Sequence, residues 1–347
     1  MTTSVSAYLP EYHEWEDYLG AKDDKSIYLR KCGAEARNLH FGKRVFVRGV
    51  IELSNYCREN CSYCGMRRDN RTLSRFRLQR DQIVQMIESG LPSSITDLNL
   101  QTGEDPRVIE EVVLPVVQYL RAHTGLGISL CLGTLDSSVL NSLRSAGAFY
   151  YILKLETGDE AHYADMSAPG TYKERMGAIH SLVSSGWKVS SGMILGLPRQ
   201  TSKMVVETLR LLTQLPLSGV SVSPFISGDE TPFAGKSSPE TSSVIHALAL
   251  LRLANPERII PAVSALSLLG NEAYGEALEA GANLVTINLT PAKERDNYLL
   301  YKRKRFIVDE KKVRDVLLKA ELEPSRISMA EHFSSVNNSP AKLHQEA

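Results

Sequence analysis

Short runs of aliphatic and β-branched residues alternate with amphipathic segments along most of the chain, from residue 45 onward. The runs predict eight strands, over residues 45–53, 95–101, 127–133, 149–156, 188–197, 219–226, 259–266 and 283–290. The amphipathic segments predict helices near 81–88, 106–122, 137–145, 171–185, 202–214, 239–253 and 271–279. A strand followed by a helix, repeated in this way, predicts a (β/α)8 TIM-type barrel of the α/β class.

The two ends of the chain lie outside this repeating pattern. Residues 1–44 have a helical pattern, and we expect an N-terminal helical extension that covers the bottom or the flank of the barrel. The barrel itself is expected over residues 45–325 and includes a C-terminal amphipathic helix at 309–320. The polar, small residues toward the end predict a disordered tail over 326–347.

The composition is that of an ordinary globular protein. Of 347 residues, 43% are hydrophobic and 23% are charged, which is enough to bury a core of barrel size. Lys plus Arg equals Asp plus Glu at 40 each, so the global charge gives no argument for nucleic acid or an anionic membrane as a partner. We therefore expect a small-molecule substrate. The first thirty residues do not resemble a signal peptide, and no apolar run reaches the roughly 20 residues that cross a bilayer, so we expect a cytoplasmic protein.

Three of the five cysteines lie within eight positions, directly after the first expected strand. Cys57, Cys61 and Cys64 form a Cys-x3-Cys-x2-Cys run in a loop at the carboxyl end of that strand, which is the catalytic face of a barrel. Three thiolates on one loop can bind three irons of a [4Fe-4S] cluster. The fourth iron then has no protein ligand and is open to the amino and carboxylate groups of S-adenosylmethionine (SAM). Reductive cleavage of SAM there would give a 5′-deoxyadenosyl radical.

Two other interpretations of the cysteines are weaker. A zinc site usually has four protein ligands and pairs Cys-x2-Cys with a distant second pair, which Cys32 and Cys131 do not supply. A disulfide would leave one thiol of the run unpaired and fits a cytoplasmic protein badly. Because free cysteine is often buried, we expect Cys32 and Cys131 to be packing residues.

The segment RGVIELSNYCRENCSYCGMRRDN, together with QTGEDP at 101–106, resembles the radical SAM superfamily. The resemblance is to the branch that contains the [FeFe]-hydrogenase maturase HydE, biotin synthase and methylornithine synthase, and it extends from about residue 38 to 325. It implies a [4Fe-4S] cluster and SAM as cofactors. It also implies that Tyr63 helps to hold adenine. Gly103, Glu104 and Asp105 match an element whose backbone receives the methionine amino group of SAM.

The resemblance assigns further SAM contacts to later strands. Glu156, in LKLET, corresponds to an acidic residue near the ribose and sulfonium, and Arg175 to a basic residue near the SAM carboxylate. GMILGLP at 192–198, with Ile194 and Gly196, matches an element that lies against adenine. Simpler roles compete with some of these assignments: Glu104 and Asp105 could only favour a helix N-terminus, and Arg175 could be a solvated helix residue. Glu156 is harder to explain as structural, because a buried carboxylate is costly unless it has a partner.

Candidate substrate groups lie at the ends of the later strands. They are polar and rich in serine, which indicates a small polar or zwitterionic substrate: Lys154, Ser190, Ser223, Ser264, Ser267, Thr286 and Asn288. Lys154 could pair with a substrate carboxylate or extend to the rim of the barrel.

Several reactions of this branch stay open. Hydrogenase cofactor maturation of the HydE kind comes first, followed by sulfur insertion into C–H bonds and by a mutase reaction of the methylornithine-synthase kind. A non-catalytic iron–sulfur or zinc-binding module is the alternative from another class. Against biotin synthase, Ser129 and Ser190 align with the cysteine ligands of its second cluster, and an arginine ligand is missing near Ala262. A second cluster on C-terminal cysteines, found in some hydrogenase maturases, has no ligands here, because no cysteine follows Cys131.

Basic residues cluster in two places, at Arg67, Arg68, Arg71, Arg75 and Arg77, and at 302–305. Because the total charge is zero, we expect a solvated rim, or a docking surface for an acidic electron donor of the flavodoxin or ferredoxin type, and not a nucleic-acid site.

Overall fold

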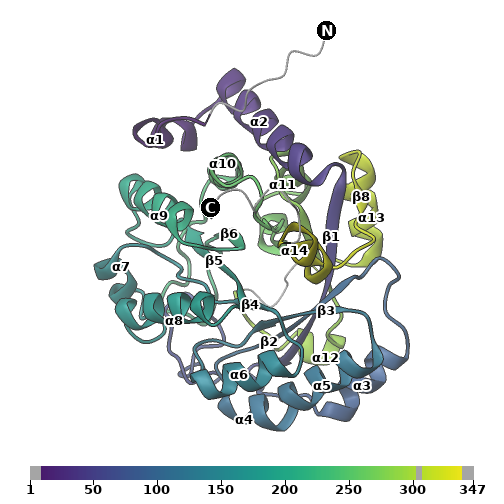
Figure 1. Ribbon diagram of the computed structural model, residues 1–347. Coiled ribbons are helices and arrows are strands. Elements are labelled where there is room, and N and C mark those ends of the chain that lie inside the picture. Colours follow the sequence, from purple (N-terminus) through teal and green to yellow (C-terminus); the bar gives the residue numbers. More distant parts are fainter. Residues whose placement is uncertain (1–8, 302–306, 338–347) are drawn as a thin grey trace.

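The computed structural model describes residues 9–301 and 307–337. Seven parallel strands form the barrel wall in the order β6-β5-β4-β3-β2-β1-β7. They are β1 (Arg44–Ser54), β2 (Asp97–Thr102), β3 (Gly127–Cys131), β4 (Tyr150–Ile152), β5 (Lys188–Leu195), β6 (Gly219–Pro224) and β7 (Leu284–Asn288). A two-residue strand, β8 (Glu323–Pro324), pairs with the beginning of β1. Figure 1 shows the strands as a ring with helices around it, so the TIM-type fold is confirmed.

The prediction of a strand over residues 259–266 is wrong. The chain there makes only two isolated parallel bridges, Gly219 with Ile259 and Pro261 with Leu284, before the 3₁₀ helix η3 (Ser264–Leu268). Pro261 has no N–H to donate, so a regular ladder cannot continue through it. The bridges nevertheless join β6 to β7 through this segment, which closes the ring in the place of the missing strand.

Helices cover the outside of the ring, broadly as the amphipathic pattern predicts. They are α3 (Arg80–Glu88), α4 (Pro106–Val108), α5 (Leu114–His123), α6 (Ser137–Ser145), α7 (Glu160–Asp165), α8 (Tyr172–Ser184), α9 (Ser202–Gln214), α10 (Thr241–Ala254), α11 (Ala273–Glu279), α12 (Ala292–Arg295) and α13 (Glu310–Lys319). The helix expected over 106–122 contains a π-helical turn, η2 (Ile109–Val113), between α4 and α5. Pro115 explains this turn, because it removes one N–H and crowds the carbonyl of the preceding turn.

The N-terminal residues form η1 (Tyr12–Glu14), α1 (Trp15–Leu19) and α2 (Asp23–Phe41). These helices pack on the flank of the barrel, mainly against α10 and also against α11 (Figure 1). Gly33 permits the close approach, because a Cβ there would lie 2.3 Å from the carbonyl oxygen of Ala280. Helix α2 therefore belongs to the same core as the barrel.

The amino ends of the strands are closed by a helix that the sequence did not predict. Residues expected to be disordered form α14 (Met329–Asn337), which lies across the ring of strands (Figure 1). Met329 is buried against Phe41, Phe46 and Leu284, and Phe333 packs on the same cluster. The expected tail is thus ordered as far as 337, and residues 338–347 lie outside the described part of the chain.

A buried carboxylate holds this helix in place. Asp97, at the beginning of β2, is fully buried, and both of its oxygens accept from the Met329 N–H at 3.1 Å. Burial raises the pKa of Asp97 to about 6, although the hydrogen bonds from Met329 and Thr96 and the charge of Arg48 oppose the shift. The folded protein therefore binds a proton on Asp97 at a pH where the unfolded chain does not.

This raised pKa predicts a pH-dependent stability. Between pH 7 and pH 5 the folded state takes up the Asp97 proton, so the free energy of unfolding should rise by about 1 kcal/mol as the pH falls. Asp97→Asn cannot titrate and should lack this part of the pH dependence. Urea unfolding of both proteins at pH 5 and pH 7 measures the difference. Equal pH dependence in the two proteins would assign the effect to other groups.

In the described parts of the chain, no helix combines the length and the apolar character that a membrane span requires.

Candidate active site

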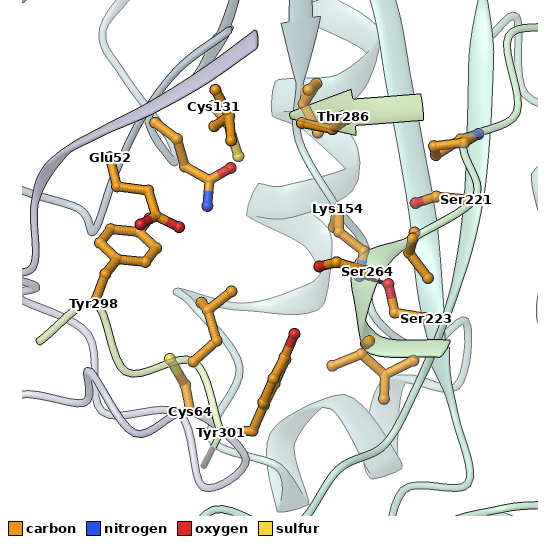
Figure 2. A pocket seen from close by; sticks show the side chains of 18 of the residues that line it. Glu52, Cys64, Cys131, Lys154, Ser221, Ser223, Ser264, Thr286, Tyr298 and Tyr301 are labelled. Carbon is orange, nitrogen blue, oxygen red and sulfur yellow. Dashed lines mark hydrogen bonds between the residues drawn. The ribbon is translucent and has the colours of Figure 1, made fainter. Parts of the chain in front are cut away.

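The interior of the barrel contains a cavity of about 420 Å³. Alternate residues of each strand point into it, so Arg48, Val50 and Glu52 of β1 line it while Val47, Ile51 and Leu53 pack outward. The predicted site residues that reach this cavity are Cys57, Cys61, Tyr63, Cys64, Gly103, Glu104, Lys154, Glu156, Arg175, Ser190, Ile194, Ser223, Ser264, Thr286 and Asn288. Figure 2 shows Cys64 on one side of the open space and Lys154, Ser223 and Ser264 on another.

Three predicted residues do not line the cavity: Asp105, Gly196 and Ser267. Gly196 forms a turn with φ +87° after β5, and its N–H donates to Gln200 at 2.7 Å. Ser267 lies in η3 and has a buried hydroxyl without a hydrogen-bond partner among the described residues.

The cysteine loop is held from inside by two side chains. Asn55 is fully buried; its amide donates to the carbonyls of Ser74 and Asn297 at 2.8 and 2.7 Å, and its oxygen accepts from the Phe76 N–H at 2.7 Å. Arg75 donates to four loop carbonyls, those of Asn55, Met66, Arg67 and Asn70. The sequence suggested that Arg75 lies on a solvated rim. It is instead a structural residue of the loop.

The thiols of this loop suit an iron–sulfur cluster. Cys61 is buried, and Cys57 and Cys64 are half-buried in the cavity wall. Burial raises the pKa of Cys57 and of Cys61, and it raises the pKa of Cys64 to about 12. Metal ions bind the thiolate form, so cluster binding would displace these protons. Within the described residues, no three His, Cys, Asp or Glu side chains converge on one metal ion; three thiolates that each bind a different iron of a cubane need no such convergence.

Glycine makes room for the loop at the end of β2. A Cβ on Gly103 would lie 2.2 Å from the carbonyl oxygen of Tyr56 and 2.9 Å from the Cβ of Cys57. The next residue, Glu104, donates its backbone N–H to the Cys57 sulfur at 3.4 Å. The ends of β1 and β2 thus meet directly at the first cysteine.

Gly103→Ala should push the cysteine loop out of place and lower the iron content per chain, because the added Cβ meets backbone that cannot move aside cheaply. Gly125→Ala is the matched control, since a Cβ there meets no atom within 4 Å. Iron and sulfide analysis after anaerobic reconstitution measures the effect. Equal cluster content in both variants would show that the close approach is unimportant.

Glu104 is held between two arginines. Its carboxylate accepts from Arg58 at 3.1 Å and from the buried Arg175 of α8 at 3.3 Å, and it also accepts from the Thr134 N–H. Arg175 donates further to the Tyr163 hydroxyl at 3.3 Å. Arg175 is therefore not a solvated helix residue, and the Glu104 side chain does more than favour a helix N-terminus.

Asp105 has a structural environment. It is buried, forms an ion pair with Arg77 at 2.7 Å and accepts from the Ser54 hydroxyl at 2.6 Å. Arg77 also stacks on the Tyr56 ring, 3.7 Å from its centroid. These contacts join the end of β1 to the beginning of α4. Arg77 therefore does not belong to the solvated rim that the sequence analysis expected.

Glu156 occupies a strained position at the edge of the cavity. Its φ is +70°, in the left-handed region that residues other than glycine rarely adopt. Two backbone hydrogen bonds to β5, with Gly192 and Ile194, hold it there at 2.9 Å each. Its Oε2 lies 3.0 Å from Lys154 Nζ, and Lys154 also donates to the Ser223 hydroxyl at 3.2 Å. Lys154 points inward, so it does not extend to the rim.

Several cavity residues were missed by sequence reasoning: Arg48, Glu52, Gln101, Cys131, Tyr150, Ser221, Tyr298 and Tyr301. The charged members of β1 gave a usable signal. Arg48 and Glu52 interrupt an apolar strand and are four residues apart, so both lie on the same face of the strand. No local pattern marks Tyr298 or Tyr301, which follow the last strand of the ring.

Comparisons with known proteins identify the family of this chain. Residues 51–212 match the family model described as the radical SAM superfamily. The [FeFe] hydrogenase maturase subunit HydE of Thermotoga maritima is 31% identical over 79% of this chain and 78% of its own length. A biotin synthase of Kocuria rhizophila is 29% identical over 70% of this chain and 53% of its own length. The crystal structure of methylornithine synthase (PylB) superposes with a TM-score of 0.82 at 25% identity, over 95% of this chain and 97% of the other.

Proposed function

Because this chain belongs to the radical SAM superfamily, whose members are enzymes that use a [4Fe-4S] cluster and SAM, we propose that Cys57, Cys61 and Cys64 bind the cluster. When bound, these cofactors supply the reductive cleavage of SAM to a 5′-deoxyadenosyl radical, which takes a hydrogen atom from the substrate. The single observation that carries the assignment is that all three thiols line the same cavity as the polar strand ends.

We propose that SAM binds in the same cavity. We assign Tyr63 and Ile194 to the adenine, and Gly103 and Glu104 to the methionine amino group; Gly196 supports the turn after the adenine strand. Arg175 lies close enough to Glu104 to bind the SAM carboxylate beside it. Asp105 acts through its contact with Arg77 and positions the loop.

Glu156 is assigned to the ribose and sulfonium. Its strained backbone turns the carboxylate toward the cavity, beside Lys154. The burial of the inner site also excludes water from the reacting atoms, which protects a radical from side reactions.

For the reaction itself we propose HydE-like chemistry on a small polar molecule in the formation of a hydrogenase cofactor. Support comes from the 31% identity to HydE and from the serine-rich inner wall, with Ser190, Ser264 and Asn288 facing the cavity. A mutase reaction of the methylornithine-synthase kind is the second candidate, because the PylB structure superposes over nearly the whole chain.

Sulfur insertion of the biotin-synthase kind has less support. Ser190 and Ala262 line the cavity where the resemblance expects ligands of a second cluster. Ser129 is fully buried, and its hydroxyl lies 3.0 Å from the Asn99 side-chain oxygen. None of these three side chains carries a sulfur or guanidinium ligand.

The proposal is tested by anaerobic reconstitution of the full chain. Absorbance near 400 nm and dithionite-dependent release of 5′-deoxyadenosine are the expected results, whereas stoichiometric zinc without either would support a zinc-binding module. Candidate substrates deuterated at one carbon then identify the reaction, because deuterium should pass into 5′-deoxyadenosine only from the true substrate.

Lys154→Met should raise the KM for the substrate by about 10- to 100-fold, as expected when a buried charge pair to a substrate carboxylate is lost. Lys203→Met is the matched control, because Lys203 is exposed on α9. Steady-state kinetics of both variants give the measurement. An unchanged KM in Lys154→Met would remove the substrate-carboxylate role.

We further propose that an electron donor of the flavodoxin or ferredoxin type docks at the cluster loop in the cytoplasm. Arg68 and Arg71 are exposed there, and Arg67 is partly exposed. Residues 302–305, the second basic run, lie outside the described part of the chain. A reduction rate that does not change with ionic strength would count against such docking.

A further inference from the structure

Cys131 is a free thiol in the wall of the reaction cavity. It ends β3 and is a half-buried residue whose side chain lines the cavity, so it does not serve only as packing. The strand register places it beside Gln101 of β2, which in turn lies beside Glu52 of β1. This row is the uppermost of the inner wall, next to the loop that carries the cluster cysteines. Figure 2 shows Cys131 and Cys64 entering the open space from different sides.

The surroundings of Cys131 keep it protonated. Burial raises its pKa to about 11, although the positive charges of Arg48 and Lys154 oppose the shift. The side chain is therefore a thiol, with a hydrogen atom on sulfur, near neutral pH.

A second observation indicates that a ligand fills the space beneath this thiol. Arg48 is nine-tenths buried and lines the same cavity from β1. It donates to the Thr286 hydroxyl at 3.3 Å, but its Nε has no hydrogen-bond partner among the described residues. A buried guanidinium with a vacant donor favours an anionic group nearby. A small molecule bound between Arg48 and the cluster loop would lie next to Cys131.

We propose that Cys131 donates a hydrogen atom to the carbon radical formed on the bound substrate. The inference rests on the proposed function, since that function produces the substrate radical. In the step, a C–H bond forms on the substrate, the S–H bond of Cys131 breaks, and a thiyl radical remains on sulfur. One electron from the flavodoxin- or ferredoxin-type donor and one proton from solvent restore the thiol.

Bond strengths favour this direction, because a thiol S–H bond is weaker than an aliphatic C–H bond. A serine O–H bond is stronger than both, so Cys131→Ser keeps the shape of the site but removes the donor. Tyr298 and Tyr301 also line the cavity, and a phenol can donate a hydrogen atom. The experiment must therefore separate the thiol from the phenols.

The first test measures access and needs no turnover. The cluster-loaded full chain is treated with methyl methanethiosulfonate, a small thiol reagent, and the modified cysteines are identified by peptide mass spectrometry. Cys131 should be modified, and bound SAM should slow the modification. Cys32, buried in α2, should not react. A Cys131 as unreactive as Cys32 would show that its thiol is closed off, and this would overturn the proposal.

The second test follows the hydrogen atom. With SAM and dithionite in D2O, and without substrate, the radical derived from SAM should take deuterium from the exchanged Cys131 thiol. The measured quantity is the deuterated fraction of 5′-deoxyadenosine, which does not depend on the rate. We expect the label in the natural protein, in Cys32→Ser and in Tyr301→Phe, and its loss in Cys131→Ser and Cys131→Ala.

The outcomes separate the two proposals. If the natural protein forms no 5′-deoxyadenosine, the proposed function fails. If 5′-deoxyadenosine forms and both Cys131 variants keep the label, only the role of Cys131 fails. Loss of the label in Tyr301→Phe instead would assign hydrogen donation to the phenol and overturn the proposal.

Discussion

Cys61→Ser is expected to leave a folded protein that retains no [4Fe-4S] cluster and forms 5′-deoxyadenosine only at the level of the cluster-free chain. Cys61 is the most buried of the three loop cysteines, and a serine hydroxyl is a poor ligand for cluster iron. Iron and sulfide content, absorbance near 400 nm and the yield of 5′-deoxyadenosine measure the loss.

Cys32→Ser is the control for this change. Cys32 lies in α2, away from the cavity, and a helical serine can donate back to a carbonyl of the preceding turn. Its cluster content should equal that of the natural protein. A cluster of normal content and activity in Cys61→Ser would show that another side chain supplies the ligand, and the assignment of the loop would then be wrong.

Arg75→Ala should lose most of its cluster although every cysteine remains. Removing the guanidinium takes a donor from the loop carbonyls of Asn55, Met66, Arg67 and Asn70, of which, among the described residues, only that of Arg67 keeps a further donor, the Asn70 N–H. We expect a cost on the order of 3 kcal/mol in loop stability. Arg75→Lys should recover only part of the cluster, because one ammonium cannot reproduce the planar set of donors.

The matched control for Arg75 is Arg71→Ala. Arg71 is exposed on the same loop, so this variant removes the same charge without opening the interior. The iron content per chain and the rate of cluster loss to a chelator compare the two. Equal retention in Arg75→Ala and Arg71→Ala would mean that the four carbonyl contacts contribute nothing to the site.

Local sequence patterns carried the main features of the fold and the site. The three cysteines lie within one loop, so their spacing could be recognised without any knowledge of distant contacts. The alternation of strands and helices likewise gave the barrel class. The prediction of a strand over 259–266 failed because the apolar residues of this segment are buried as in a strand, while Pro261 prevents regular pairing.

The parts that could not be predicted depend on partners far away in the sequence. The ion pair of the Asp105 side chain with Arg77 could not be predicted, and Arg75 was expected on a solvated rim, whereas the loop folds around it. Helix α14 is polar on most of its surface, so its composition suggested disorder. Met329 and Phe333, four residues apart, form the narrow face that the barrel buries.

That helix also constrains how the enzyme is loaded. With Met329 and Phe333 packed over the amino ends of the strands, the described part of the chain leaves the cluster end as the way into the interior. SAM, once bound at the loop, would stand across that entrance. We therefore expect the order of addition to matter: SAM that binds before the small molecule should block its entry, so a high SAM concentration should inhibit turnover competitively with respect to the substrate.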